Sequence, residues 1–206
     1  MSKDIKTFVS YINSNNLQAD LITGDGGIKK SKDIDYLLEE YNHLPLFLGE
    51  IISALFTQKP GGTFILKMYD IVYINSINLI TLLSGFYKTV DIVKPYNSRP
   101  CNTEKYIICS DFIGFNVTTS DKEKIFNNLL SILDNLNTLD KKSKKDYKFF
   151  NIFENLESNQ ENNDKIIEFN NSIIVKTQLL HLQDIYDIIM KDDPKQIKLI
   201  KTYFGP

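Results

Sequence analysis

Three ionisable side chains stand where strands of the predicted sheet begin or end. Asp25 follows the first predicted strand, Lys67 interrupts the second near its carboxyl end, and Glu104 begins the last. Ligands of such sheets bind beyond the carboxyl ends of the parallel strands. A last strand that runs the opposite way brings its amino end to the same edge. We therefore expect the two carboxylates and the amine to converge.

Such a group of side chains could activate a hydroxyl. A lysine between Leu66 and Met68 on a buried strand is desolvated, which lowers its pKa, whereas two nearby carboxylates raise it, so the net direction stays open. The amine could be a general base or an electrostatic partner while a hydroxyl attacks an electrophilic methyl group. Each residue also has an ordinary explanation: Asp shapes glycine-rich turns, Glu can begin a strand, and lysine can extend from a strand to solvent.

The spacing of apolar residues predicts strands that alternate with helices. We expect helices at residues 1–16, 44–57 and 75–87, and strands at residues 19–23, 63–69, 90–93 and 105–111. Pro45 should break or restart its helix, Pro60-Gly61-Gly62 should form a turn, and the apolar run at 63–69 should be buried on both faces. The order predicts an α/β fold, the C-terminal half of a Rossmann-like sheet, mostly parallel with a final antiparallel strand.

The composition changes beyond residue 117. We expect residues 1–117 to form the partial Rossmann-like domain and residues 118–206 to form a helical extension. Within the extension we expect helices at 121–139, 166–190 and 198–204, and a polar, Asn-rich loop near 155–165.

Composition narrows the class of protein without choosing a function. A formal charge of −2 over 206 residues gives no global sign of nucleic-acid affinity, so such a contact would need a local basic patch. No run of about 18 apolar residues and no leader-like segment is seen, so we expect a soluble, intracellular protein that does not contact a membrane. The two cysteines lack partners at metal-ligand spacing, so we expect no metal site.

Three stretches resemble the FtsJ-like family of S-adenosylmethionine-dependent RNA ribose 2′-O-methyltransferases, most closely its mRNA cap branch. They are ADLITGDGG (19–27), GGTFILKMYD (61–70) and KPYNSRPCNTEKYIIC (94–109). The family uses a Lys-Asp-Lys-Glu tetrad, and its second, third and fourth members match Asp25, Lys67 and Glu104. The resemblance implies a class I methyltransferase fold with these three as catalytic residues.

The resemblance also implies a reaction and its participants. S-adenosylmethionine would be the methyl donor, and RNA, at the capped 5′ end of mRNA, the acceptor. Lys67 would take the proton of the ribose 2′-hydroxyl while Asp25 and Glu104 orient it, and Asp25 and Gly26 would contact the donor. The residues that would contact RNA are Lys30, Ser98 and Arg99. Arg99 could instead support the loop before Glu104.

The sequence departs from the family pattern at its start. The family's first tetrad lysine and glycine-rich donor loop lie several strands before the aspartate, whereas 24 residues precede Asp25. The strand at 19–23 would then have an open edge. A second polypeptide could complete the sheet, the gene could be truncated or split, or the N-terminal helix or helical extension could cover the edge. The chain could be a methyltransferase, a fragment of one, or an inactive subunit that binds RNA or protein.

Three tyrosines near the predicted edge, Tyr69, Tyr73 and Tyr96, could stack on a cap or a base. Packing in the core or at its rim is the simpler expectation for each, because aromatic residues are common in any sheet domain. Aromatic content alone therefore does not identify an RNA-binding surface.

Overall fold

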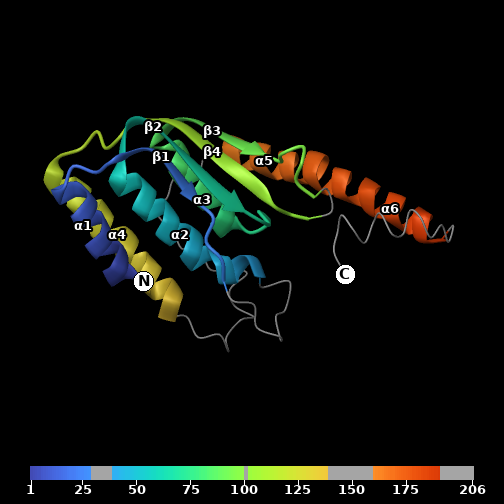
Figure 1. The fold of residues 1–206 in the computed structure, drawn as a ribbon, viewed down its shortest axis with the longest axis horizontal. Helices are drawn as coiled ribbons and strands as arrows, with labels where there is room; N and C mark the ends of the chain where they lie inside the picture. The colour runs from blue at the N-terminus through green and yellow to red at the C-terminus, as the bar shows by residue number, and fades with distance from the viewer. Residues whose placement is uncertain (29–38, 100–101, 139–159, 191–206) are drawn as a thin grey trace.

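The computed structural model describes residues 1–28, 39–99, 102–138 and 160–190 (Figure 1). Its elements are α1 (Ser2–Ser14), β1 (Ala19–Gly24), α2 (Glu39–Thr57), β2 (Gln58–Met68), α3 (Ile74–Ser84), β3 (Tyr87–Val93), β4 (Lys105–Phe112), α4 (Thr119–Thr138), α5 (Gln160–Phe169), the π-helix η3 (Asn170–Val175) and α6 (Lys176–Met190). The predicted helix at 198–204 lies outside these residues.

Four strands form one mixed sheet in the order β1-β2-β4-β3. β1 and β2 are parallel, and β4 is antiparallel to both of its neighbours. Three strands therefore point the same way and the last one in the sequence points the other way. The predicted α/β fold, a mostly parallel sheet with a final antiparallel strand, is confirmed.

Helices α2 and α3 pack together on one face of the sheet, as Figure 1 shows. Phe64, Leu66 and Met68 of β2 point into this core and are fully buried, whereas Ile65 and Lys67 alternate with them and are half-buried. The prediction that this strand is buried on both faces was wrong for the Lys67 face. That face is where the candidate site lies.

Pro45 does not break α2, contrary to expectation. The helix continues from Glu39 to Thr57 through the proline. Proline removes one backbone hydrogen bond and crowds the preceding turn. Here the residues on both sides of it are held by the core: Leu44, Phe47, Leu48, Ile51 and Ile52 are each at most 2% exposed. Burial of these side chains outweighs the lost bond.

The segment Pro60-Gly61-Gly62 is part of β2 rather than a turn between elements. It forms a bulge, because Ala19 pairs with Gln58 and the next aligned pair is Leu21 with Thr63. Gly61 has a φ of +77°, and a Cβ on Gly62 would lie 2.9 Å from the backbone oxygen of Asp20. The glycines thus signal an irregular backbone, as predicted, but within a strand.

β1 is an edge strand of the sheet. Within the part of the chain that the structure describes, no strand pairs with its outer side, and Leu21 is 59% exposed. α1 packs against α2 and α4, and α5 packs against α3. Among the described residues, neither the N-terminal helix nor the C-terminal helices take the place of a neighbouring strand.

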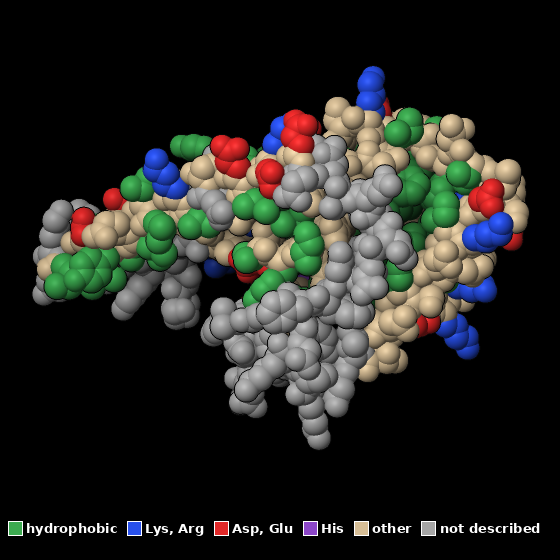
Figure 2. Space-filling model, turned by 180° about the vertical axis from the view of Figure 1, so that it is seen from behind, with side chains coloured by type: hydrophobic (Ala, Val, Ile, Leu, Met, Phe, Trp, Pro, Cys, Tyr) green, Lys and Arg blue, Asp and Glu red, His purple; other side chains and the backbone are tan. Residues whose placement is uncertain are grey.

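The C-terminal helices begin earlier than predicted. α5 starts at Gln160, so the second half of the expected polar loop near 155–165 is helical, and residues 155–159 lie outside the described part. Its polar residues face solvent or make specific contacts, as in the ion pair of Glu161 with Lys165 at 2.7 Å. Helix α6 exposes apolar side chains (Figure 2), among them Leu179, Leu182, Tyr186, Ile189 and Met190.

Two further properties concern the described residues alone. None of their helices has both the length and the apolar character that crossing a bilayer requires. Nor do they contain a group of three or more His, Cys, Asp or Glu side chains placed to hold a metal ion.

Candidate active site at the edge of the sheet

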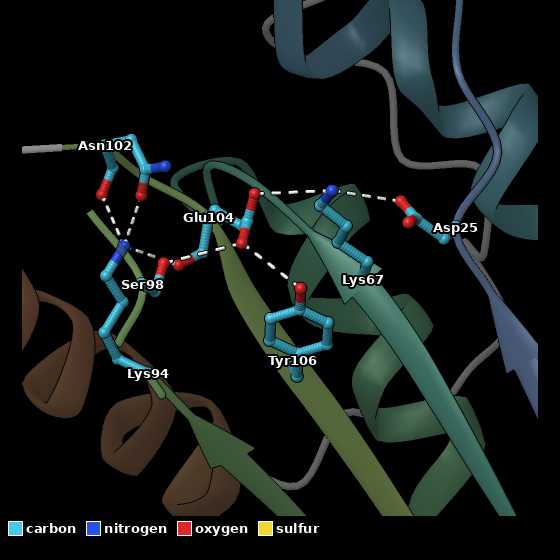
Figure 3. Close-up of polar contacts among 7 residues, drawn as sticks. All are labelled: Asp25, Lys67, Lys94, Ser98, Asn102, Glu104 and Tyr106. Atoms are coloured by element: carbon cyan, nitrogen blue, oxygen red, sulfur yellow. Dashed lines mark hydrogen bonds and ion pairs between the residues drawn. The ribbon is translucent and has the colours of Figure 1, made fainter. Parts of the chain in front are cut away.

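The three residues singled out from the sequence lie together at one edge of the sheet (Figure 3). Nζ of Lys67 lies 3.1 Å from Oδ1 of Asp25 and 3.3 Å from Oε2 of Glu104. Lys67 comes from the carboxyl end of β2, Asp25 directly follows β1, and Glu104 directly precedes the antiparallel β4. The predicted convergence of an amine with two carboxylates is confirmed.

The balance of charge and burial at Lys67 favours the charged amine. Hydrogen bonding to Asp25 raises its pKa, burial opposes this, and Glu104 adds to the rise, so the pKa lies above its ordinary value. The side chain is 17% exposed, so the desolvation that lowers a lysine pKa is incomplete. The structure thus gives the direction that the sequence left open. In this arrangement the amine carries its proton at neutral pH.

Glu104 sits in a network of polar contacts (Figure 3). Its Oε1 accepts hydrogen bonds from the Tyr106 hydroxyl at 3.2 Å and from the Ser98 hydroxyl at 3.4 Å. Its backbone oxygen accepts a bond from Nζ of Lys94 at 2.8 Å, and the same ammonium donates to the backbone oxygen of Asn102 at 2.8 Å. Burial, followed by the neighbouring Glu104, raises the pKa of Tyr106. The carboxylate is thus fixed from several directions.

Asp25 lies in a more open environment, with its side chain 66% exposed. The loop that carries Asp25 is bonded to helix α2, because the backbone N–H of Gly26 donates to Oε1 of Glu50 at 2.8 Å. A Cβ on Gly26 would lie 2.8 Å from the end of the Leu46 side chain and 2.9 Å from the end of the Glu50 side chain, so a larger residue here would require these side chains to move. The glycine brings the loop onto α2.

Glu50 is a residue that the sequence reasoning missed. Burial raises the pKa of its carboxyl, the bond from Gly26 opposes the rise, and Asp25 adds to it. Among the described residues its Oε2 has no hydrogen-bonding partner. The available signal was an acidic residue on the apolar stretch Phe47 to Phe56 of α2, where a lone carboxyl needs a partner.

The residues predicted to contact RNA are placed unevenly. Ser98 contacts Glu104, Arg99 lies on the same loop with its side chain exposed, and Lys30 lies outside the described residues. Among the tyrosines, Tyr69 and Tyr73 pack against the core as expected. Tyr96 is fully exposed, so the expectation of core or rim packing was wrong for it.

Comparisons with known proteins identify a family that this chain is similar to. A model of the FtsJ-like methyltransferase family matches residues 2–112, more than half of the chain. Cap-specific mRNA (nucleoside-2′-O-)-methyltransferase 1 of Dictyostelium discoideum is 34% identical over 116 residues, which is 55% of this chain and 15% of that protein. The Trypanosoma cruzi protein of the same name is 37% identical over 94 residues, which is 46% of this chain and 26% of that protein.

A solved structure from Plasmodium falciparum, assigned as a ribosomal RNA methyltransferase, aligns with a TM-score of 0.42 and 26% identity. The alignment covers 52% of this chain and 56% of that one. The chain spans less than a third of the length of either cap-specific relative. On the family match over residues 2–112, the chain belongs to the FtsJ-like methyltransferase family.

Proposed function

We propose that this chain carries catalytic residues of an RNA ribose 2′-O-methyltransferase that acts on the capped 5′ end of mRNA. The observation that carries the proposal is the position of Lys67 between the carboxylates of Asp25 and Glu104 at the sheet edge. The cap as the target is supported by the names of the Dictyostelium discoideum and Trypanosoma cruzi relatives.

Lys67 is the proposed base for the ribose 2′-hydroxyl. The donor would supply the electrophilic methyl group, with the electron pair of its carbon–sulfur bond staying on sulfur, and Nζ of Lys67 would take the proton of the attacking hydroxyl. Lys67 must first release its own proton, which its raised pKa opposes. A positive charge near the amine lowers that pKa. Asp25 and Glu104 keep the amine directed at the acceptor.

S-adenosylmethionine, when bound, supplies both an electrophilic methyl group and a positive charge. The exposed carboxylate of Asp25 is suited to attract such a charge, and no atom of another described residue lies within 4 Å of the Cβ position of Gly27, so these residues leave space beside the loop. The backbone N–H of Gly26 is already bonded to Glu50. Asp25 would therefore hold the donor while Gly26 shapes the loop.

The surface that would receive RNA is the loop between β3 and β4. Arg99 is exposed for a phosphate contact, Tyr96 is exposed for stacking on a base, and Ser98 contacts Glu104 at the site itself. Lys30, predicted from the sequence to contact RNA, lies outside the described residues and stays a prediction. We also propose that a second polypeptide completes the sheet at the outer edge of β1, which the described residues leave unpaired.

The test is transfer of labelled methyl from S-adenosylmethionine to capped RNA. Lys67→Met should lower the rate by about 10²- to 10⁴-fold, the usual contribution of a general base. Lys59→Met is the matched control, because Lys59 lies on the same strand and pairs with the exposed Asp20 at 3.0 Å, away from the site. Transfer that survives the Lys67 change would remove Lys67 from the mechanism.

The second candidate is a catalytically inactive subunit that binds RNA. It is favoured by the raised pKa of Lys67, because an ammonium ion attracts phosphate but cannot accept a proton. In that case the unaltered chain would transfer no methyl group, yet RNA binding measured by fluorescence anisotropy would weaken in Lys67→Met and not in Lys59→Met. Methyl transfer by the unaltered chain would exclude this candidate.

A further inference from the structure

Among the described residues, Ile166 of the C-terminal helical segment, residues 160–190, packs against the core, and three amide side chains of the segment form hydrogen bonds to the rest of the protein. Oδ1 of Asn163 lies 3.2 Å from the hydroxyl of Thr81 on α3, and Oδ1 of Asn170 accepts a bond from Nζ of Lys105 at 3.1 Å. Nε2 of Gln178 donates to the backbone oxygen of Asn102 at 2.6 Å. In Figure 1, α5 lies beside the β3–β4 side of the sheet and α6 extends away from it.

The spacing of these amides follows the helix geometry. Asn163 and Asn170 are seven residues apart, which is two turns of α-helix. Gln178 follows eight residues later, and the wider turns of η3 absorb the additional residue so that all three face the protein body. The π-helix therefore sets which side of α6 meets the loop before β4.

The Lys105 contact is buried, unlike an ordinary surface contact. Lys105 is 1% exposed and Asn170 is 8% exposed. The ammonium also donates to the backbone oxygen of Tyr69 at 2.7 Å. A charged amine in this position loses its hydration, so it needs every available acceptor. Asn170 is one of the two acceptors that the structure gives it.

The contacts of Asn170 and Gln178 both reach the backbone next to the candidate site. Lys105 directly follows Glu104 and points to the opposite face of the sheet, and Tyr69 lies two residues beyond Lys67. Asn102, which accepts the Gln178 bond, lies two residues before Glu104. The helical segment thus holds the backbone on both sides of Glu104.

We propose that Asn170 and Gln178 are positioning residues, which hold Glu104 within hydrogen-bonding distance of Lys67. Their importance for methyl transfer rests on the function proposed above, but their effect on the geometry does not. Loss of either contact lets the start of β4 move relative to β2. A displacement of about 1 Å is enough to weaken a catalytic arrangement.

The acylation rate of Lys67 reports on this geometry directly. Acetic anhydride modifies the neutral amine, and Glu104 raises the pKa of Lys67, so a displaced Glu104 makes the amine more reactive. We expect Asn170→Ala and Gln178→Ala, each in the full chain, to raise the Lys67 rate about three- to tenfold, since one pKa unit corresponds to a tenfold change in neutral amine. Mass spectrometry would compare Lys67 with Lys59 in the same molecule.

Two variants separate positioning from general loosening. Gln183 lies on the same helix as Gln178, and among the described residues its side chain bonds only to Asp187. Gln183→Ala should therefore leave the acylation rate of Lys67 unchanged. Asn170→Asp keeps an acceptor for Lys105 and should not raise the rate. If Gln183→Ala raised the acylation rate of Lys67 as much as Gln178→Ala does, the proposal would be overturned.

An unchanged Lys67 rate in folded Asn170→Ala and Gln178→Ala would also overturn it. If Asn170→Ala does not fold, Gln178→Ala decides, because its partner is a backbone carbonyl outside the core. The labelling needs neither methyl donor nor RNA. A chain that transfers no methyl group but shows the expected labelling pattern would contradict the proposed function and leave this inference standing.

Discussion

The two carboxylates that flank Lys67 are held in very different ways. Glu104 is 21% exposed, directly precedes an inner strand of the sheet, and accepts bonds from two hydroxyls besides its contact with Lys67. Asp25 is 66% exposed and follows the edge strand, and its loop is tied down by the bond from Gly26 to Glu50. One side of the site is built into the sheet, and the other lies at its margin.

This difference separates positioning from access. A carboxylate fixed by neighbouring hydroxyls can keep Lys67 in place before any substrate arrives, at no cost of reorganisation during the reaction. An exposed carboxylate on a short loop can meet a ligand that approaches from outside. The Glu104 side therefore fits orientation of the base, and the Asp25 side fits reception of the methyl donor under the proposed function.

The largest expected difference is in the free energy of unfolding, between substitutions in β4, which follows Glu104, and in β1, which precedes Asp25. Ile107 of β4 is fully buried, so Ile107→Ala should lower the free energy of unfolding by about 2–5 kcal/mol through lost burial and a cavity. Leu21 of β1 is 59% exposed, and Leu21→Ala should change that free energy by about 0.5 kcal/mol or less. Urea denaturation of the full chain measures both. Equal losses would mean that β1 is as tightly packed as β4.

A second prediction concerns how the free energy of unfolding depends on pH through Lys105, which directly follows Glu104. Burial lowers its pKa from 10.5 to about 8, against the attraction of Asp70 and Glu40 and with the help of Lys94. Between about pH 8 and pH 10.5 the Lys105 amine holds its proton in the unfolded chain but not in the folded protein. Lys105 therefore makes folding more favourable as the pH rises through this range. Below pH 8 both states carry the proton, and the contribution stops changing.

Comparison with Lys105→Met isolates this effect from the other titrating groups. The stability advantage of the unaltered protein over the variant should grow between about pH 8 and 10.5, by at most about 1.4 kcal/mol per pH unit. Urea denaturation at several pH values measures it, with Lys59→Met as the matched control for removal of an exposed lysine. A constant difference for Lys105→Met would show that Lys105 is not desolvated in the folded protein.

The contrast between the two acids also marks what the sequence could predict. The meeting of Asp25, Lys67 and Glu104 follows from local patterns, because each residue lies at the end of a strand or next to it, and strand direction decides which ends share an edge. The difference in how they are held depends on contacts between distant residues. The bond from Gly26 to Glu50 joins residues 24 positions apart, and no periodicity in the sequence signals it.

The errors in the fold have the same origin. A local rule against proline was overridden at Pro45 by burial of the surrounding helix. A polar composition predicted a loop near residues 155–165, but Asn163 has a partner on α3 and is buried there. Local propensity therefore predicted the elements that pack by simple alternation, and failed where a tertiary contact decided the outcome.

The hold on the Asp25 loop can be tested through Glu50. Glu50→Ala removes the acceptor of the Gly26 N–H, and amide hydrogen exchange at Gly26 should become about tenfold faster, as expected for loss of one hydrogen bond. Glu50→Gln keeps an acceptor oxygen and removes the ionisable carboxyl, so exchange should stay close to that of the unaltered protein. Equal exchange in all three proteins would mean that Glu50 does not hold the loop.

The smallest expected effect distinguishes the two acids by their response to salt. Both raise the pKa of Lys67, Asp25 through the shorter contact and Glu104 from the more buried position. Asp25→Asn and Glu104→Gln should each make Lys67 more reactive towards acetic anhydride than it is in the unaltered protein. At about 1 M salt, where the screening length is roughly 3 Å, the increase caused by Asp25→Asn should shrink by a few fold, whereas that caused by Glu104→Gln should persist. Mass spectrometry of Lys67 at low and high salt measures both ratios. If salt reduced both increases alike, the two carboxylates would be equally solvated, and the division of the site into a fixed side and an open side would not hold.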